Sequence, residues 1–180
     1  MKESPQLLRT RTVYSSKTFS VREDRVRDDG REHTWSIVEH PGAYAILAQP
    51  DPATVLLVRQ YRQAAGRRLL EIPAGTADAG ETPAQGALRE LAEETGYRAG
   101  RIEPALAAFT TPGFCTEFMH FFHATELQAG PVAFDSDEAI ETLSVRLDEA
   151  LALLDNGEIA DAKTAAGLLW LDRLMRQQFR

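Results

Sequence analysis

Short runs in which apolar and polar residues alternate occupy residues 11–40, a pattern typical of β-strands. The stretch 22–27 alternates loosely, and Asp28-Asp29-Gly30 is a hairpin turn signal before a further strand at 33–40. Large apolar residues are few in this segment, so it cannot bury a core of its own. We expect it to pack on the rest of the chain or on another subunit.

Stronger apolar runs begin at residue 43 and are separated by turn signals such as Pro50-Asp51-Pro52. Strands before, between and after two helical patterns indicate an α/β (α+β) domain, with helices packed on a mixed sheet. The strands are predicted at 43–48, 54–59, 69–72, 106–110, 119–124 and 140–145.

The first helical pattern begins at Thr82-Pro83-Ala84-Gln85, a capping box with proline at the first helical position. It ends at Thr95-Gly96, where glycine suits a left-handed cap. The second covers about 164–178, and a short helix is expected to begin at Asp148. The apolar stripe expected on the first helix is Ala84, Ala87, Leu88 and Leu91, and that on the second is Ala165, Leu168, Leu169, Leu171, Leu174 and Met175.

Composition narrows the class of protein. The 180 residues are 43% hydrophobic and 26% charged, which suits one globular domain with a small appendage and excludes disordered or collagen-like chains. A net charge of −7 argues against nucleic-acid or acidic-membrane binding. One cysteine, no apolar run of the roughly 18 to 20 residues that a membrane span needs, and no signal-like N-terminus together predict a cytoplasmic protein.

Three glutamates are predicted to lie on the first helix opposite its apolar stripe: Glu90, Glu93 and Glu94. Like charges three and four residues apart repel, and the C-terminal end of a helix disfavours anions. A divalent cation would offset both costs, and carboxylates without Cys or clustered His select Mg²⁺ or Mn²⁺ over zinc. The alternative is a solvated acidic helix face.

The segment GTADAGETPAQGALRELAEETGY, residues 75–97, resembles the Nudix box. That pattern is Gly, five residues, Glu, seven residues, then Arg-Glu-U-x-Glu-Glu-x-Gly-U, where U is bulky and usually aliphatic. Every position matches, except that the aromatic Tyr97 fills the last U. The resemblance implies an α/β/α sandwich over residues 41–180 that hydrolyses a nucleoside diphosphate linked to another group.

The same resemblance assigns roles to the box. Glu90 and Glu94 are implied as direct metal ligands, Glu93 as a further ligand or base, and the backbone carbonyl of Ala74 as another ligand. Bound divalent ions would polarise phosphoryl oxygens and turn a water into a nucleophile. We expect Gly75 to provide the freedom for a tight bend against the helix. Two residues could orient the loop and helix or take part in catalysis: Glu81 and Arg89.

Three features outside the box are similar to the ADP-ribose pyrophosphatase branch of this family. They are LEIPAG at 70–75, Pro112 fifteen residues after Tyr97 and within PGFCTE, and GEIADAKT at 157–164. The branch implies Mg²⁺- or Mn²⁺-dependent hydrolysis of ADP-ribose to AMP and ribose 5-phosphate by a homodimer, for which residues 1–40 are the expected contact. The alternatives are another substrate (an NDP-sugar, NADH, FAD or a damaged nucleotide) and a module that binds ADP-ribose without cleaving it.

Substrate contacts are predicted first in residues 55–70, which hold four arginines and no acid. This local positive excess suits a diphosphate. The branch places basic residues at Arg59 and Arg62, whereas Arg67 and Arg68 could simply keep a strand edge soluble. Glu71 lies on the strand that enters the site and could contact the base or ribose, or be an ordinary strand-end carboxylate.

Further candidates lie in two later loops. Pro112 and Gly113 form a turn that could bring backbone close to a ligand, and Glu117 could bind ribose or join the metal site. In the branch, a mobile glutamate of an acidic loop activates the water; Glu138 corresponds to it, Asp137 is its rival, and a solvated loop is the alternative. Three residues are expected to be structural: Cys115 as a small filler, and His120 and His123 facing out from a strand.

Overall fold

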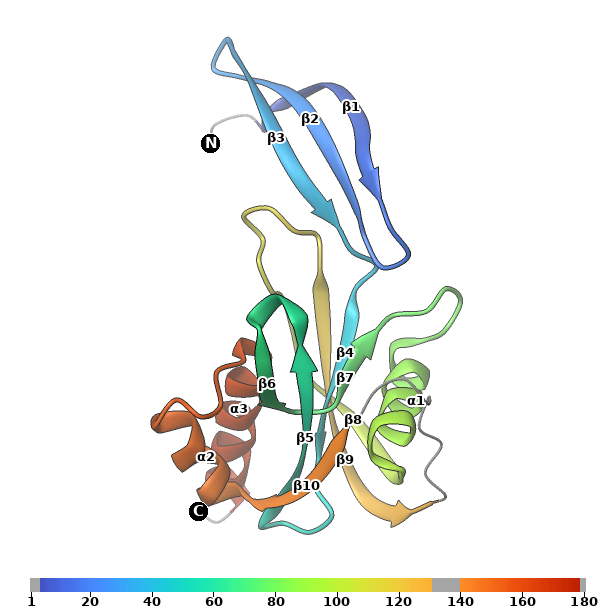
Figure 1. The fold of residues 1–180 in the computed structure, drawn as a ribbon, viewed down its shortest axis with the longest axis vertical. Coiled ribbons are helices and arrows are strands. Elements are labelled where there is room, and N and C mark those ends of the chain that lie inside the picture. Colours follow the sequence, from blue (N-terminus) through green and yellow to red (C-terminus); the bar gives the residue numbers. More distant parts are fainter. Residues whose placement is uncertain (1–3, 131–139, 179–180) are drawn as a thin grey trace. The chain divides into compact units, whose positions relative to one another are not determined.

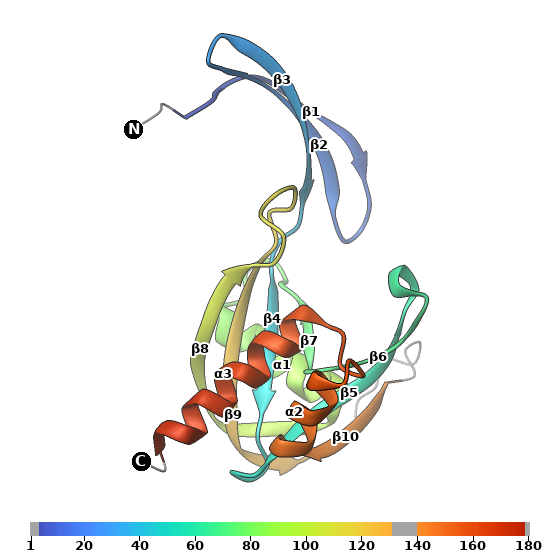
Figure 2. The same cartoon turned by 90° about the vertical axis from the view of Figure 1, so that its left-hand side faces the viewer.

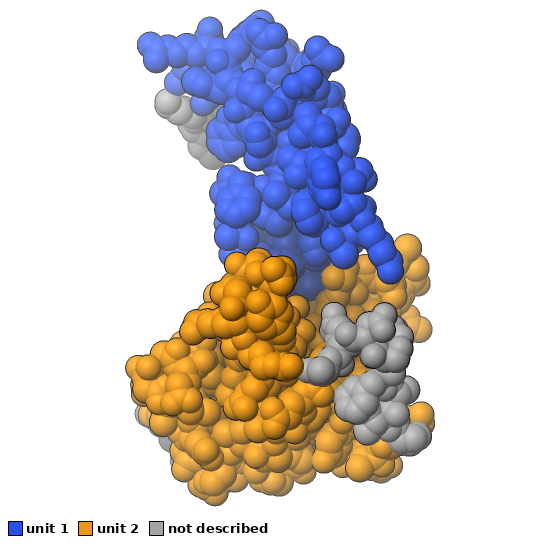
Figure 3. Space-filling view, viewed as in Figure 1, with its two compact units in different colours: residues 1–43, 108–119 blue, residues 44–107, 120–180 orange. Residues whose placement is uncertain are grey.

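The computed structural model of the chain describes residues 4–130 and 140–178. The chain divides into two compact units, shown in different colours in Figure 3. The predicted N-terminal β region falls in the first unit, together with a loop from the middle of the chain. Unit 1 consists of residues 1–43 and 108–119, and unit 2 of residues 44–107 and 120–180.

Unit 1 contains an antiparallel sheet in the order β1-β2-β3. The hairpin predicted at Asp28-Asp29-Gly30 is confirmed, since Asp28 pairs with Arg31 and the two residues between them have positive φ, 48° and 74°. Every residue of β1 is exposed, as are Tyr14 and Trp35, so this sheet buries little apolar surface of its own. The strands are β1 (Gln6–Ser15), β2 (Ser20–Asp28) and β3 (Arg31–Glu39).

Unit 2 is built on two sheets, one in the order β7-β4-β9-β8 and the other in the order β10-β5-β6. All six residues of β4 are buried, which explains its continuous apolar run. The strands predicted within residues 11–40 cover only the second half of β1, β7 was not predicted, and β8 begins directly after the helix cap rather than at residue 106. The strands are β4 (Ala43–Ala48), β5 (Thr54–Arg62), β6 (Arg67–Glu71), β7 (Ala74–Thr76), β8 (Tyr97–Phe109), β9 (Phe118–Ala129) and β10 (Glu141–Arg146), with a 3-10 turn at Gln63–Ala65.

Three helices cover these sheets: α1 (Pro83–Thr95), α2 (Leu147–Asp155) and α3 (Ala162–Gln178). Helix α1 lies on one side of the strands, and α2 and α3 lie on the other, as both ribbon views show (Figures 1 and 2). The expected α+β fold, a sandwich in which helices cover both sides of the sheets, is confirmed. Within the described residues, no helix combines the length and the apolar character that crossing a membrane requires.

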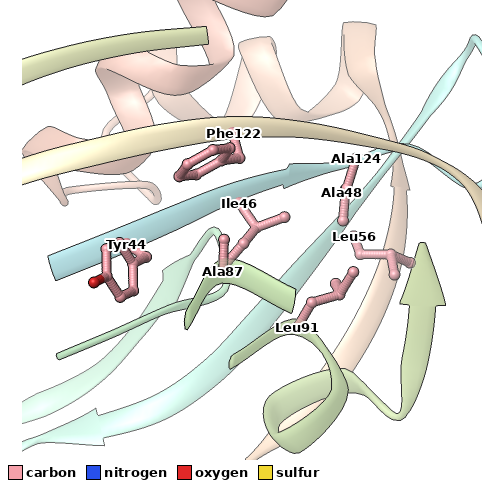
Figure 4. Packing of buried hydrophobic residues seen from close by; sticks show 8 residues of the cluster. All are labelled: Tyr44, Ile46, Ala48, Leu56, Ala87, Leu91, Phe122 and Ala124. Carbon is pink, nitrogen blue, oxygen red and sulfur yellow. The ribbon is translucent and has the colours of Figure 1, made fainter. Parts of the chain in front are cut away.

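Apolar side chains from α1, β4, β5 and β9 form the core beside α1 (Figure 4). Ala87 and Leu91 are fully buried there, as predicted, but Leu88 is 36% exposed. The helix is turned so that Glu90 and Glu94, rather than Leu88, flank the buried stripe. On α3, Leu169 is likewise 57% exposed, although it was predicted to be on the apolar face.

Candidate active site

Helix α1 has well-defined ends, which fix the positions of its side chains. The Thr82 hydroxyl accepts a hydrogen bond from the backbone N–H of Gln85, and the Gln85 side chain accepts one from the backbone N–H of Thr82. This confirms the predicted capping box. At the other end, Gly96 has φ 73° and its N–H donates to the carbonyl of Ala92.

Glu90 and Glu94 are both buried, although they were predicted on the face opposite the apolar stripe. They lie one turn apart and face the start of β7. A Cβ on Gly75 would lie 1.9 Å from the carboxyl carbon of Glu90, so only glycine leaves room for this carboxylate. Gly75 is therefore needed for close approach rather than for a positive φ, and the expected tight bend is supplied by Gly80, whose φ is 87°.

Burial raises the pKa of both carboxyls. Glu94 accepts a hydrogen bond of 2.9 Å from the N–H of Ala74, which partly offsets burial, while the charge of Glu90 acts with burial. Burial outweighs the hydrogen bond, so the pKa of Glu94 is raised to about 7. Burial also raises the pKa of Glu90, against the opposing effect of Arg89. Two buried acids side by side are costly without a cation, as expected at a functional site.

Arg89 connects the loop before α1 to the acidic side chains. Its Nε and Nη2 donate to the two carboxylate oxygens of Glu81 at 3.2 and 3.0 Å, and Nη2 also donates to the carbonyl of Thr76. Its Nη1 donates to Glu90 at 2.7 Å and to Glu93 at 2.9 Å. The hydrogen bonds from Arg89 lower the pKa of Glu81. This geometry supports an orienting role for both Arg89 and Glu81.

The donor set suits a hard cation. Glu90 and Glu94 offer carboxylate oxygens, and the peptide of Ala74 is adjacent to Glu94 through the hydrogen bond of its N–H. Glu93 has a half-exposed side chain and is paired with Arg89. Across residues 4–130 and 140–178, no three Asp, Glu, His or Cys side chains converge into a ready-made metal cluster. Protein oxygens would thus supply part of a coordination shell that water and substrate complete, as is usual for Mg²⁺.

A second cluster lies on the inward face of β5, close enough to Glu94 for its cations to lower the pKa of that carboxyl. Arg62 Nε and Nη2 each donate to one oxygen of Glu71 at 2.8 Å, and Lys163 also donates to Glu71. Glu71 is 1% exposed, and these cations lower its pKa although burial opposes them. The structure therefore places two predicted substrate residues, Arg62 and Glu71, against each other.

Two donors in this region have no partner among the described residues. The amide nitrogen of Gln60 is buried without a hydrogen bond, and Nη1 of Arg62 makes no hydrogen bond within the described part of the chain. Because residues two apart on a strand share a face, both side chains belong to the same surface of β5. An unpaired buried donor such as the Gln60 amide is rare, whereas the Arg62 side chain is 41% exposed; both donors suit a ligand rich in acceptors.

The remaining predicted residues belong to other faces or segments of the chain. Arg59 is on the opposite face of β5 and sits 3.6 Å from Glu141. Pro112 and Gly113 form a turn in unit 1, closed by a hydrogen bond from Cys115 N–H to the carbonyl of Thr111. Glu117, also in unit 1, accepts a 2.6 Å hydrogen bond from the hydroxyl of Thr110. Two further candidates, Glu138 and Asp137, lie outside the described residues.

The prediction for the two strand histidines is wrong for His123. His123 is half-buried, its Nε2 lies 2.7 Å from the Gln49 side-chain oxygen, and its ring meets that of Trp170 edge-on.

Two residues of the polar cluster were also missed: Gln60 and Lys163. Gln60 follows Arg59 within the VRQYR motif, and Lys163 is the last residue of Asp-Ala-Lys in the 157–164 segment. The signal that could have found them is a polar side chain within an otherwise apolar strand or at the start of a helix.

The raised pKa of Glu94 has a measurable consequence for stability. The folded protein holds this proton up to about pH 7, whereas an unfolded glutamate releases it near its ordinary pKa. Without metal, the free energy of unfolding should therefore fall as the pH rises from the unfolded to the folded pKa of Glu94, by up to about 3 kcal/mol for this group. We expect denaturant unfolding in EDTA to show a larger loss from pH 5 to pH 8 for wild type than for Glu94→Gln. Equal losses would contradict the assignment.

Comparison with known proteins identifies the family. Residues 38–168 match the NUDIX domain, so the chain belongs to the Nudix family. It is 40% identical over 162 residues to the ADP-ribose pyrophosphatase of Bacillus subtilis (strain 168), which covers 88% of each chain. It is 34% identical over 167 residues to the methanol dehydrogenase activator of Bacillus methanolicus, with 91% of this chain and 90% of that protein covered.

A solved structure described as an ADP compounds hydrolase has the same fold. It superimposes with a TM-score of 0.88 and covers 99% of this chain and 97% of that one. Its sequence identity is 22%, so the likeness concerns the fold alone. Together with the box at residues 75–97, the family match identifies the chain as a Nudix hydrolase, a class that generally needs a divalent metal.

Proposed function

We propose that this chain hydrolyses the pyrophosphate bond of ADP-ribose, yielding AMP and ribose 5-phosphate, with Mg²⁺ or Mn²⁺ as its cation. The observation that carries the substrate is the 40% identity to an ADP-ribose pyrophosphatase along 88% of both chains. The buried acids on α1, together with two donors on β5 that have no partner among the described residues, support it. One side suits hard cations, and the other suits the oxygens of a diphosphate.

Glu90, Glu94 and the carbonyl of Ala74 would hold the divalent ion. When bound, such an ion polarises phosphoryl oxygens and lowers the pKa of a water molecule. Arg89 holds Glu90 and Glu93 in place and ties them to Glu81 in the preceding loop. Glu93, with its half-exposed side chain, is free of the core and could serve as a further ligand or a base.

Gln60 and Arg62 are the groups best placed to receive the diphosphate. Nη1 of Arg62 carries two N–H donors, and the fork shape of a guanidinium matches phosphate oxygens. Glu71 acts through Arg62, because its own oxygens are buried and already paired. Five residues keep substrate or catalytic roles on the resemblance alone: Arg59, Pro112, Gly113 and Glu117 as substrate contacts, and Glu138 as the general base.

A substrate panel tests this function. Purified protein would be incubated with Mg²⁺ or Mn²⁺ and ADP-ribose, GDP-mannose, NADH or FAD, and the products separated by chromatography. We expect the highest kcat/KM for ADP-ribose, with AMP and ribose 5-phosphate formed in equal amounts and no products in EDTA. A preference for another compound would replace the substrate, and binding of ADP-ribose without AMP formation would overturn the hydrolytic function.

We propose further that two copies associate through the sheet of unit 1. Its strands leave large apolar side chains in solvent, including Val13, Tyr14 and Trp35, and an interface would remove them from water. In a two-fold symmetric dimer, the same surface of the second copy would cover these side chains. Gel filtration with light scattering should give twice the chain mass of 19.9 kDa. A single-chain mass at micromolar concentration would contradict the proposal.

A further inference from the structure

We propose that Lys163 is a positioning residue for the reaction: it holds the carboxylate of Glu71 so that Arg62 is fixed beside the acidic face of α1. This inference rests on the proposed function, since it concerns how the same site receives a diphosphate. Lys163 lies in the first turn of α3, 92 residues from Glu71 in sequence, and its role does not follow from the Nudix box.

Lys163 connects two acidic side chains. Its ammonium donates to Glu71 and, at 2.8 Å, to Asp161, and its side chain is only 11% exposed. Asp161 in turn accepts hydrogen bonds from the N–H and hydroxyl of Thr164 at the start of α3. A lysine with this much burial and two carboxylate partners is held in one position, unlike a solvated surface lysine.

The start of α3 is also tied to the strand segment that enters the site. The Thr164 hydroxyl accepts a 2.9 Å hydrogen bond from the N–H of Ile72, which follows Glu71 directly. Two residues further on, Ala74 donates to Glu94. Lys163 therefore anchors Glu71 from the helix side while the backbone of the same segment reaches the helix of the acidic cluster.

Charge explains why the lysine is needed. Glu71 and Asp161 carry two negative charges, and Arg62 alone would leave the cluster with an excess of one. With Lys163 the four groups sum to zero, so the guanidinium of Arg62 keeps its free Nη1 available for a ligand. Without Lys163, an extra negative charge would remain beside Glu94, where it repels a diphosphate.

The test compares four variants with wild type: Lys163→Met, Lys163→Arg, Arg62→Met and the double variant. We expect Lys163→Met to raise KM for ADP-ribose about tenfold or more while kcat changes less, and Lys163→Arg to restore most of the loss. In the Arg62→Met background, Lys163→Met should change KM less than about twofold, because both act through one group. The control is Arg176→Met, which removes an exposed, ion-paired cation from the same helix.

Each outcome is decisive. Suppose that the wild type turns over ADP-ribose but the KM of Lys163→Met stays within twofold of wild type. That result would overturn only the role of Lys163, as would an equal effect of Lys163→Met on KM in the wild-type and Arg62→Met backgrounds. Absence of wild-type turnover would overturn the proposed function and this role with it. If Lys163→Met does not fold, Lys163→Gln, which keeps a polar end group without the charge, takes its place; its KM should rise, and a wild-type KM would overturn the inference.

Discussion

Replacing Glu94 by glutamine should abolish most activity and leave the fold intact. The substitution keeps the volume of the side chain and its hydrogen bond from Ala74 but removes a buried carboxylate charge. We expect kcat/KM for ADP-ribose to fall by about a thousand-fold, about 4 kcal/mol of transition-state stabilisation. Because burial opposes the charge in the metal-free protein, Glu94→Gln should unfold at an equal or higher temperature in EDTA.

The matched control is Glu149→Gln, which neutralises an exposed carboxylate in the first turn of α2. It should change kcat/KM less than about twofold, as is usual for surface positions. Calorimetric titration with Mn²⁺ gives a reading that does not depend on turnover. Wild type and Glu149→Gln should bind the ion with similar affinity, and Glu94→Gln more weakly; retention of activity within a factor of two would make the ligand assignment wrong.

Alanine at Gly75 and at Gly86 should separate activity from stability. At Gly75 the added methyl meets the flexible end of Glu90, which can be displaced from the site without unfolding the core. We expect kcat/KM to fall at least about a hundred-fold, with a melting temperature within a few degrees of wild type. At Gly86 the methyl would lie 2.0 Å from the Tyr44 ring, so that variant should lose stability first.

Thermal unfolding and steady-state kinetics on the two purified variants check this contrast. A Gly75→Ala protein that unfolds as early as Gly86→Ala would show that the glycine serves packing rather than the site. Normal kinetics of Gly75→Ala would show that Glu90 can move without consequence. Either result would contradict the geometric reason given for the first glycine of the box.

The sequence predicted the helix ends and the central strands well, because their signals are local. Capping boxes, a proline at the first helical position and a glycine cap act within four or five residues. The fully buried β4 was equally clear as a continuous apolar run. The three-residue β7 was missed because it is too short to show any period, although it carries the peptide that meets Glu94.

The side-chain contacts of the site could not be predicted where distant parts of the chain decide them. Glu90 and Glu94 were predicted opposite the apolar stripe, as metal ligands or as a solvated acidic face, since helical period alone cannot show that a glycine opposite makes room for buried carboxylates. Arg59 and Arg62 looked equivalent, although three residues along a strand reverse the face. The contact between Glu71 and Lys163 joins residues 92 apart, and no local pattern encodes it.

The amide nitrogen of Gln60, which has no hydrogen-bond partner among the residues that the structure describes, has a consequence for efforts to stabilise this enzyme. A donor left without an acceptor in the interior weakens the folded state by about 1–3 kcal/mol. An aliphatic replacement would remove that penalty, so a screen for heat tolerance should select it. If Gln60 receives the diphosphate as proposed, the same screen would remove that donor, and the most heat-stable variants would be less active.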